Sequence, residues 1–104
     1  MVEFENGHPC GYLIHGNGDP WMKIYQACIQ YDARRREHGL ELVKRLFYKA
    51  CFLGRKGISL WCATDLDANE FWRDAGFHLV GTRAGGERRH RVHNLWVKVG
   101  VPLL

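Results

Sequence analysis

The sequence contains no apolar stretch of the length that a membrane-spanning helix needs, which is about 20 residues. The first residues, Met1 to His8, lack the apolar core of a secretory signal peptide. No low-complexity tract interrupts the chain. These absences favour one globular domain over the 104 residues, 1–104, and we expect it in the cytoplasm without a membrane partner.

Paired cysteine motifs are also missing. None of the four cysteines is spaced as Cys-x-x-Cys, and three of them lie in apolar runs, where a free thiol behaves as a small core residue. Reduced, buried thiols are therefore a better interpretation than a disulfide framework or a zinc site. His90 and His93 do not supply a metal site either, because residues three apart on a strand face opposite sides.

Positive charge is in excess and is unevenly placed. The net charge is +4, with one cluster at Arg34 to Arg36 and another from Arg83 to Lys98. Such clusters are ordinary on solvated faces, and they also suit a phosphate-bearing ligand or an acidic partner. An acidic protein or a nucleic acid is therefore a candidate partner.

The first half of the chain predicts a hairpin followed by a helix. Residues 10–15 and 21–30 have the composition of strands, and 16–20 (GNGDP) is typical of a turn. The glycines do not form a phosphate-binding loop, because strand-like sequence follows them where a helix is needed. Apolar residues spaced by three and four predict a helix over about 40–53, which Gly54 would cap.

The second half predicts a buried strand over 58–62 and then a helix. Thr64 to Asp67 has the pattern of a capping box, and the helix would end at Gly76. Residues 77–82 and 89–99 predict two closing strands, joined by the loop 84–87. The order β-β-α-β-α-β-β indicates a mixed α/β (α+β) sheet, mainly antiparallel, with a central β-α-β crossover and two main helices.

A glycine-bearing loop joins the second predicted strand to the first helix. It follows Ile29 and contains Arg36 and Gly39 before Glu41. Such a loop turns several backbone N–H groups outward, and the helix dipole adds partial positive charge there. The segment therefore predicts a pyrophosphate site, to which Arg36 adds a full charge.

This segment, 29–41, resembles the signature of the GNAT N-acetyltransferases, a strand followed by Arg/Gln-x-x-Gly-x-Gly/Ala and a helix. Residues 65–77 (DLDANEFWRDAGF) are similar to that family's Asn-x-x-Ala-x-x-Phe-Tyr-x-x-x-Gly-Phe. Residues 77–82 and 94–98 resemble its closing hairpin, so the resemblance covers roughly residues 21–99. The resemblance implies the GNAT fold.

It also implies transfer of an acetyl group from acetyl-coenzyme A (acetyl-CoA), as co-substrate, to a primary amine of a protein or small molecule. Backbone amides of the central strand would hold the thioester carbonyl, and most of the rate would come from holding amine and thioester together. Carried over by position, the coenzyme-binding residues are Ile29, Tyr31, Arg36, Glu37, His38, Gly39, Leu40, Glu41, Asp65, Phe71 and Trp72.

Three features depart from the family pattern. Glu41 stands where the family prefers Gly or Ala, and its charge would oppose a pyrophosphate at the same helix turn. Trp72 stands where many members have a Tyr that protonates the departing thiolate, and an indole N–H has no usable acidity. The short lead, Met1 to Pro9, lacks the family's usual N-terminal strand and helices, so a second subunit, as in a homodimer, is one way to complete the acceptor side.

The catalytic groups stay open at this point. Tyr31, Asp32 and His38 are candidates near the loop, while Tyr25 and Cys62 are further candidates for the proton donor. On the last predicted strand one face would carry Arg89, Arg91 and His93, and the other His90, Val92 and Asn94. In the resembled fold this closing hairpin borders the acceptor groove. Two alternatives to an active acetyltransferase are a catalytically degenerate binding protein and a nucleic-acid-modifying relative.

Overall fold

The computed structural model describes residues 1–5, 8–29, 36–84 and 91–100, with the backbone alone placed for 2–5, 8–10, 29 and 36. Its elements are β1 (Val2–Glu5), β2 (His8–Gly16), β3 (Trp21–Ile29), α1 (Arg36–Phe52), β4 (Gly57–Ala63), α2 (Ala68–Asp74), β5 (His78–Ala84) and β6 (Val92–Val99). Neither helix of this part of the chain has the length and apolar character needed to cross a membrane.

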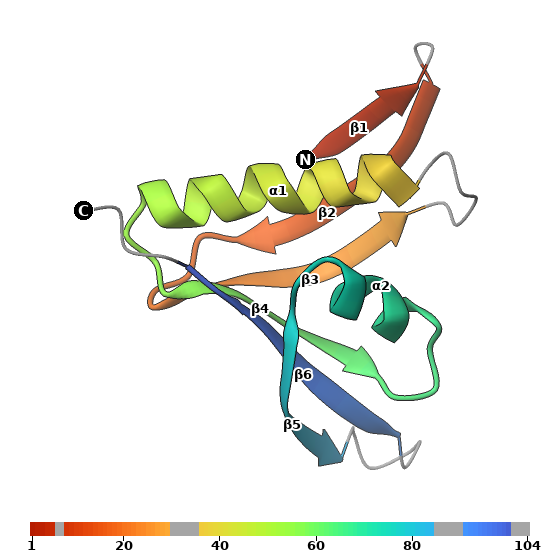
Figure 1. Ribbon diagram of the computed structural model, residues 1–104, viewed down its shortest axis with the longest axis vertical. Helices are drawn as coiled ribbons and strands as arrows, with labels where there is room; N and C mark the ends of the chain where they lie inside the picture. Colours follow the sequence, from red (N-terminus) through yellow and green to blue (C-terminus); the bar gives the residue numbers. More distant parts are fainter. Residues whose placement is uncertain (6–7, 30–35, 85–90, 101–104) are drawn as a thin grey trace.

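The strands form one sheet in the order β1-β2-β3-β4-β6-β5 (Figure 1). β3 and β4 pair in parallel, and every other neighbouring pair is antiparallel. A parallel pair needs a crossover connection, which α1 supplies between β3 and β4. The predicted mixed, mainly antiparallel α+β sheet with a central crossover and two main helices is confirmed.

Both helices pack on the same face of the sheet. Leu42 and Leu46 of α1 are fully buried, and they share one core cluster with Phe71 of α2, Leu60 of β4 and Trp96 of β6. Figure 1 shows α1 and α2 in front of the strands. In the described part of the chain no helix covers the opposite face, which we call the open face. It carries Trp61 of β4 beside Leu95 of β6.

The N-terminal lead forms a strand, which corrects the expectation that none precedes residue 10. Val2–Glu5 pairs with β2 in an antiparallel ladder, and the Leu13 backbone N–H donates to the Met1 carbonyl at 2.9 Å. The segment alternates apolar and acidic residues (VEFE), so the sequence does carry a short strand signal here. The neighbouring edge of β2 is what makes this segment a strand.

The predicted capping box at Thr64 to Asp67 is wrong. Asp67 precedes α2 with helical backbone angles and makes no side-chain capping bond. The Leu66 backbone N–H donates to Ala63 O at 3.1 Å, which makes residues 63–66 a turn. The side chain of Asn69 then binds the carbonyls of Ala63 and Leu66, so this turn is closed by a buried amide instead.

Two other boundaries move. α1 begins at Arg36, about one turn before the predicted start. The sequence did not predict this first turn because it is polar and lacks the apolar spacing by which helices are recognised. The last strand begins at Val92 rather than at residue 89, and Arg91 precedes it. His93 and Asn94 face opposite sides of β6, as predicted, whereas His90 lies outside the described residues.

Candidate active site

The central feature of the sheet is a divergence between its two parallel strands. β3 and β4 pair only from Trp21 with Gly57 to Ile24 with Leu60. Both strands continue, β3 to Ile29 and β4 to Ala63, and Figure 1 shows them separating beyond the paired segment. Beyond the paired segment the backbone N–H and C=O groups of β3 and β4 do not hydrogen-bond one another. They can therefore bind an extended ligand that lies between the strands.

A β-bulge in β3 lies where the divergence begins. On β2, Ile14 pairs with Gln26 and His15 pairs with Ile24, which leaves Tyr25 as the extra residue. A bulge bends its strand and increases the local twist. The Tyr25 ring leans over Gly16 of β2, where a Cβ atom would lie 2.9 Å from its hydroxyl group. β3 thus turns its backbone, rather than a bulky side chain, toward β4.

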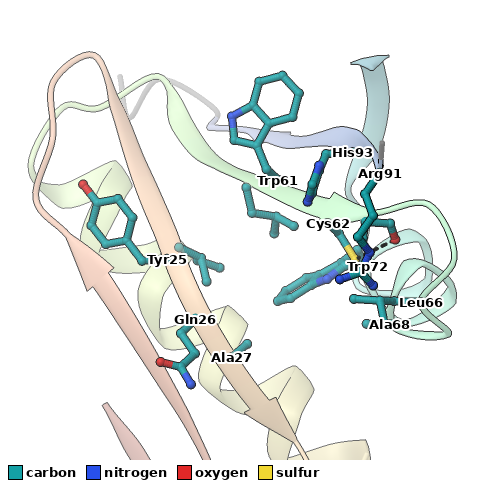
Figure 2. Close-up of a pocket in the computed structure, with 13 residues that line it drawn as sticks. Tyr25, Gln26, Ala27, Trp61, Cys62, Leu66, Ala68, Trp72, Arg91 and His93 are labelled. Carbon is teal, nitrogen blue, oxygen red and sulfur yellow. Dashed lines mark hydrogen bonds between the residues drawn. The ribbon is translucent and has the colours of Figure 1, made fainter. Parts of the chain in front are cut away.

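The gap between the strands is a pocket of about 310 Å³. Figure 2 shows Trp61 and His93 on one side of it, with Trp72, Leu66 and Ala68 on another. The full lining is Ile24, Tyr25, Gln26, Ala27, Leu60, Trp61, Cys62, Ala63, Leu66, Ala68, Trp72, Arg91 and His93. The pocket therefore combines an apolar wall from β4 and α2 with polar groups from β6 and the segment before it.

Cys62 and Trp72 form the inner wall. Both side chains are buried, and Trp72 packs edge-on against Phe71 and Phe77. Burial raises the pKa of the Cys62 thiol, and the neighbouring Trp72 indole, which hydrogen-bonds the sulfur, offsets this rise only in part. Cys62 is therefore a neutral thiol at physiological pH and does not act there as a nucleophile.

His93 brings an imidazole to the pocket from β6. Its Nδ1 is buried and has no hydrogen-bond partner among the described residues. Since His15 Nδ1 and Arg55 Nε are also without partners in the described part of the chain, what distinguishes His93 is that its side chain lines the pocket. Arg91, two residues earlier, donates to both carboxylate oxygens of Asp65, at 3.1 and 3.3 Å, and so forms a charge-neutral clasp at the rim.

The predicted coenzyme contacts from the first motif lie along the start of α1. Glu37 and Glu41 are exposed, His38 and Leu40 are half-buried, and Gly39 is buried. Because the helix begins at Arg36, Glu41 lies in its second turn and not in the first. Its charge is therefore farther from the terminal amides than the sequence indicated, which weakens the expected conflict with a pyrophosphate.

The predicted contacts from the second motif separate into three roles. Trp72 lines the pocket, as its place in the motif suggested. Phe71 is a core residue. Asp65 is exposed and is held by Arg91, so the structure gives it a partner within the chain.

Some predicted residues cannot be placed. Tyr31 and Asp32 lie outside the described residues, and for Ile29 and Arg36 the structure gives the backbone only. α1 nevertheless begins near the end of β3 (Figure 1). The N-terminal amides of this helix are thus the positive end of a dipole close to the diverging strands.

Sequence reasoning missed Trp61, Ala27 and the neighbourhood of His93. Ala27 pairs with buried Leu13 and lines the pocket with its small side chain. Trp61 is separated from His93 by 32 positions in the sequence, yet the antiparallel register of β4 and β6 makes them near neighbours. Only the strand pairing carries that information, because neither residue belongs to a local motif.

The solved structures that superpose on this chain include several acetyltransferases. The aminoglycoside 6'-N-acetyltransferase from Enterococcus faecium superposes with a TM-score of 0.78 at 15% identity, over 99% of this chain and 73% of that one. A Bacillus anthracis protein assigned as a streptothricin acetyltransferase, in complex with acetyl-CoA, superposes with a TM-score of 0.81 at 16% identity, over 94% and 60%.

A third neighbour is the ribosomal-protein-S18-alanine N-acetyltransferase from Escherichia coli, with a TM-score of 0.74 at 13% identity, over 97% of this chain and 67% of that one. The chain thus spans between 60% and 73% of the length of these three proteins. No family model matches the sequence, and neither does any curated protein. The diverging parallel strands and the superpositions agree that this chain has the fold of the GNAT acetyltransferases.

Proposed function

We propose that the protein transfers an acetyl group from acetyl-CoA to a primary amine. The observation that carries the proposal is the divergence of β3 from β4 beyond Ile24 and Leu60, with a pocket between the strands. A neighbour of the same fold holds acetyl-CoA. The substrate arm of the coenzyme is an extended chain of amides, and an open strand edge binds such a chain through its backbone N–H and C=O groups.

Each part of the coenzyme then has a matching feature. The pyrophosphate is held at the N-terminal amides of α1, where the dipole favours negative charge. The amide-bearing arm runs between β3 and β4, and the thioester reaches the pocket beside Cys62 and Trp72. A backbone N–H of the bulged segment of β3 donates to the thioester oxygen and stabilises the oxyanion that forms during attack.

The reaction needs one proton to move from the amine to the leaving sulfur. The amine nitrogen attacks the thioester carbon, the C–N bond forms, and the C–S bond breaks as the tetrahedral adduct collapses. We assign the proton acceptor to His93, whose buried Nδ1 has no partner in the described residues and whose side chain lines the pocket. Histidine commonly serves this role near neutral pH, and the protonated ring then returns the proton to the departing thiolate.

The first test is calorimetric titration of the protein with acetyl-CoA. Leu66→Trp adds bulk to the pocket at a residue that is half exposed, so the fold tolerates it. Leu79→Trp is the matched control, because Leu79 is equally exposed on β5 and lies outside the pocket lining. We expect the wild type and Leu79→Trp to bind and Leu66→Trp to bind at least about tenfold more weakly.

The companion measurement is release of free coenzyme A thiol in the presence of primary amines. Circular dichroism of all three proteins shows whether each is folded. Absence of acetyl-CoA binding by the folded wild type would remove the proposal and leave a GNAT scaffold used for binding another partner. Binding without thiol release, over a broad amine panel, would leave a coenzyme-binding protein that does not catalyse.

A further inference from the structure

On the open face of the sheet, a cation of β5 is stacked on an aromatic ring of β4. The guanidinium carbon of Arg83 on β5 lies 3.9 Å from the centre of the Trp61 ring on β4. Arg91 is paired with Asp65, whereas no carboxylate of the described residues lies within 4.0 Å of Arg83. Its charge is therefore available to a ligand.

Trp61 holds this guanidinium in place. A planar guanidinium in contact with a ring face gains cation–π and stacking energy while its N–H donors, which lie in its own plane, remain free. Trp61 is 38% exposed, so its other surfaces reach the pocket and the solvent. The pair Trp61–Arg83, which we call the Trp61–Arg83 shelf, is thus a pre-positioned donor of paired hydrogen bonds to a carboxylate or phosphate.

The shelf lies beside the pocket. In the strand register, Ala63 of β4 pairs with His93 of β6, and His93 pairs with Arg83 of β5. Side chains directly opposite on adjacent strands lie about 5 Å apart at Cβ. Both Trp61 and His93 also line the pocket (Figure 2). A single small molecule can therefore place an anionic group on Arg83 and its amine beside the imidazole of His93.

The charges around the pocket mouth do not all neutralise one another. Arg91 and Asp65 neutralise each other, whereas Arg83, like Lys23 of β3, has no acidic partner among the described residues. A polycationic amine is repelled by that charge, whereas an amine that carries an anionic group gains a charge-assisted hydrogen bond. The asymmetry sets a preference among acceptors without needing any change in the coenzyme site.

We propose that the Trp61–Arg83 shelf binds a carboxylate or phosphate on the amine acceptor, so that the preferred substrates are small amines with an anionic group two or three bonds from the amine-bearing carbon. The inference rests on the proposed acetyltransferase function. Binding of an anionic amine to the shelf can be measured without catalysis. Failure of this inference can therefore be told apart from failure of the proposed acetyltransferase function.

The experiment compares matched acceptors and matched variants. The acceptors are 2-aminoethyl phosphate, 3-aminopropanoate and its neutral amide, and the variants are Arg83→Gln, Arg83→Lys and the control Arg73→Gln. Arg73 is an exposed arginine of α2 that lies over the Trp96 ring at 6.0 Å and does not line the pocket. We expect kcat/KM for each anionic amine to exceed that of the neutral amide at least about tenfold, which is one good charged hydrogen bond.

Arg83→Gln should abolish that ratio and leave the neutral amide unchanged, Arg83→Lys should keep part of it, and Arg73→Gln should keep all of it. The phosphate and the carboxylate arms show which anion is preferred. Separately, the Trp61 indole N–H signal in a proton–nitrogen NMR spectrum should shift on adding either anionic amine, and not in Arg83→Gln. Equal use of neutral and anionic amines, or no shift at Trp61, overturns the inference whether or not acetyl-CoA is bound.

Discussion

The indole Nε1 of Trp96 donates a hydrogen bond of 2.8 Å to Oδ1 of Asn69, which joins β6 to α2 through the core. The same amide oxygen accepts from Nδ2 of Asn94 at 3.1 Å. Its Nδ2 donates to the carbonyls of Ala63 and Leu66, at 2.8 and 2.7 Å. One buried side chain therefore ties together β4, the turn after it, α2 and β6.

Replacing this amide should destabilise the whole domain. Asn69→Ala leaves the buried Trp96 indole N–H without a partner and removes the side-chain donor from the carbonyls of Ala63 and Leu66, and we expect a loss of about 3 kcal/mol in the free energy of unfolding. Urea denaturation measures it. Asn17→Ala, in the exposed turn between β2 and β3, is the control and should change stability by less than about 0.5 kcal/mol. Equal losses of unfolding free energy in both variants would show that the hydrogen bonds of Asn69 do not stabilise the domain.

Gly57 should tolerate no side chain. It begins β4 with φ of +150°, and a Cβ atom there would collide with the carbonyl oxygen of Lys98 on β6. We expect Gly57→Ala to lower the thermal midpoint or to prevent folding, because both the backbone angle and the contact oppose it. Gly81→Ala is the matched control, since nothing lies within 4 Å of a Cβ atom at that site. A wild-type midpoint for Gly57→Ala would contradict this account.

Stability should fall as the solution becomes acidic, in part through His15. Burial lowers the pKa of His15 below its ordinary value of 6.5, and the positive charges of Lys49 and the N-terminus act in the same direction. Below pH 6.5 the unfolded chain binds a proton that the folded chain resists, so the free energy of unfolding decreases as pH falls and is fully regained above 6.5.

The check is a series of denaturation curves between pH 5 and 8. His15→Gln removes the titrating group and should flatten the curve of stability against pH. His78→Gln, at an exposed site on β5, should leave its slope unchanged. A slope that survives in His15→Gln would assign the acid sensitivity to other groups.

The thiols should differ in reactivity. Cys62 is buried and its pKa is raised, whereas Cys28 is exposed. Because only the thiolate reacts, we expect iodoacetamide to modify Cys62 at least about tenfold more slowly than Cys28 at pH 8. Peptide mass spectrometry over a time course measures both rates in one sample. Comparable rates would show that the pocket wall opens to solvent.

His93 should matter for turnover more than for binding. If it takes the proton from the amine, His93→Gln lowers kcat by about a hundredfold while acetyl-CoA affinity, measured by calorimetry, stays within twofold. His78→Gln is the control and should keep wild-type kinetics. Full activity in His93→Gln would leave deprotonation to water or to another group.

The site was only partly predictable, and particular residues show why. Trp72 could be placed because the motif around Gly76 is local, and Gly39 could be placed at the start of α1 for the same reason. The contact of Asp65 with Arg91 could not be foreseen from a local motif, since the two residues are 26 positions apart. His93 and Trp61 meet only through the β4–β6 register, so local sequence could not reveal that they share a pocket.

By itself the sequence determined the identity of most elements. The spacing of Leu42, Val43 and Leu46 determines a helix with one buried face, and the run Ile58 to Cys62 determines a buried strand, because periodicity and composition act between near neighbours. The tertiary structure alone decided where β3 leaves β4, that residues 2–5 pair with β2, and that Asn69 rather than a capping box closes the turn before α2. The divergence of β3 from β4 depends on residues far apart in the chain, such as Ile24 and Leu60. The other two depend on nearer residues, but their hydrogen bonds form only once β2 and the turn before α2 are folded.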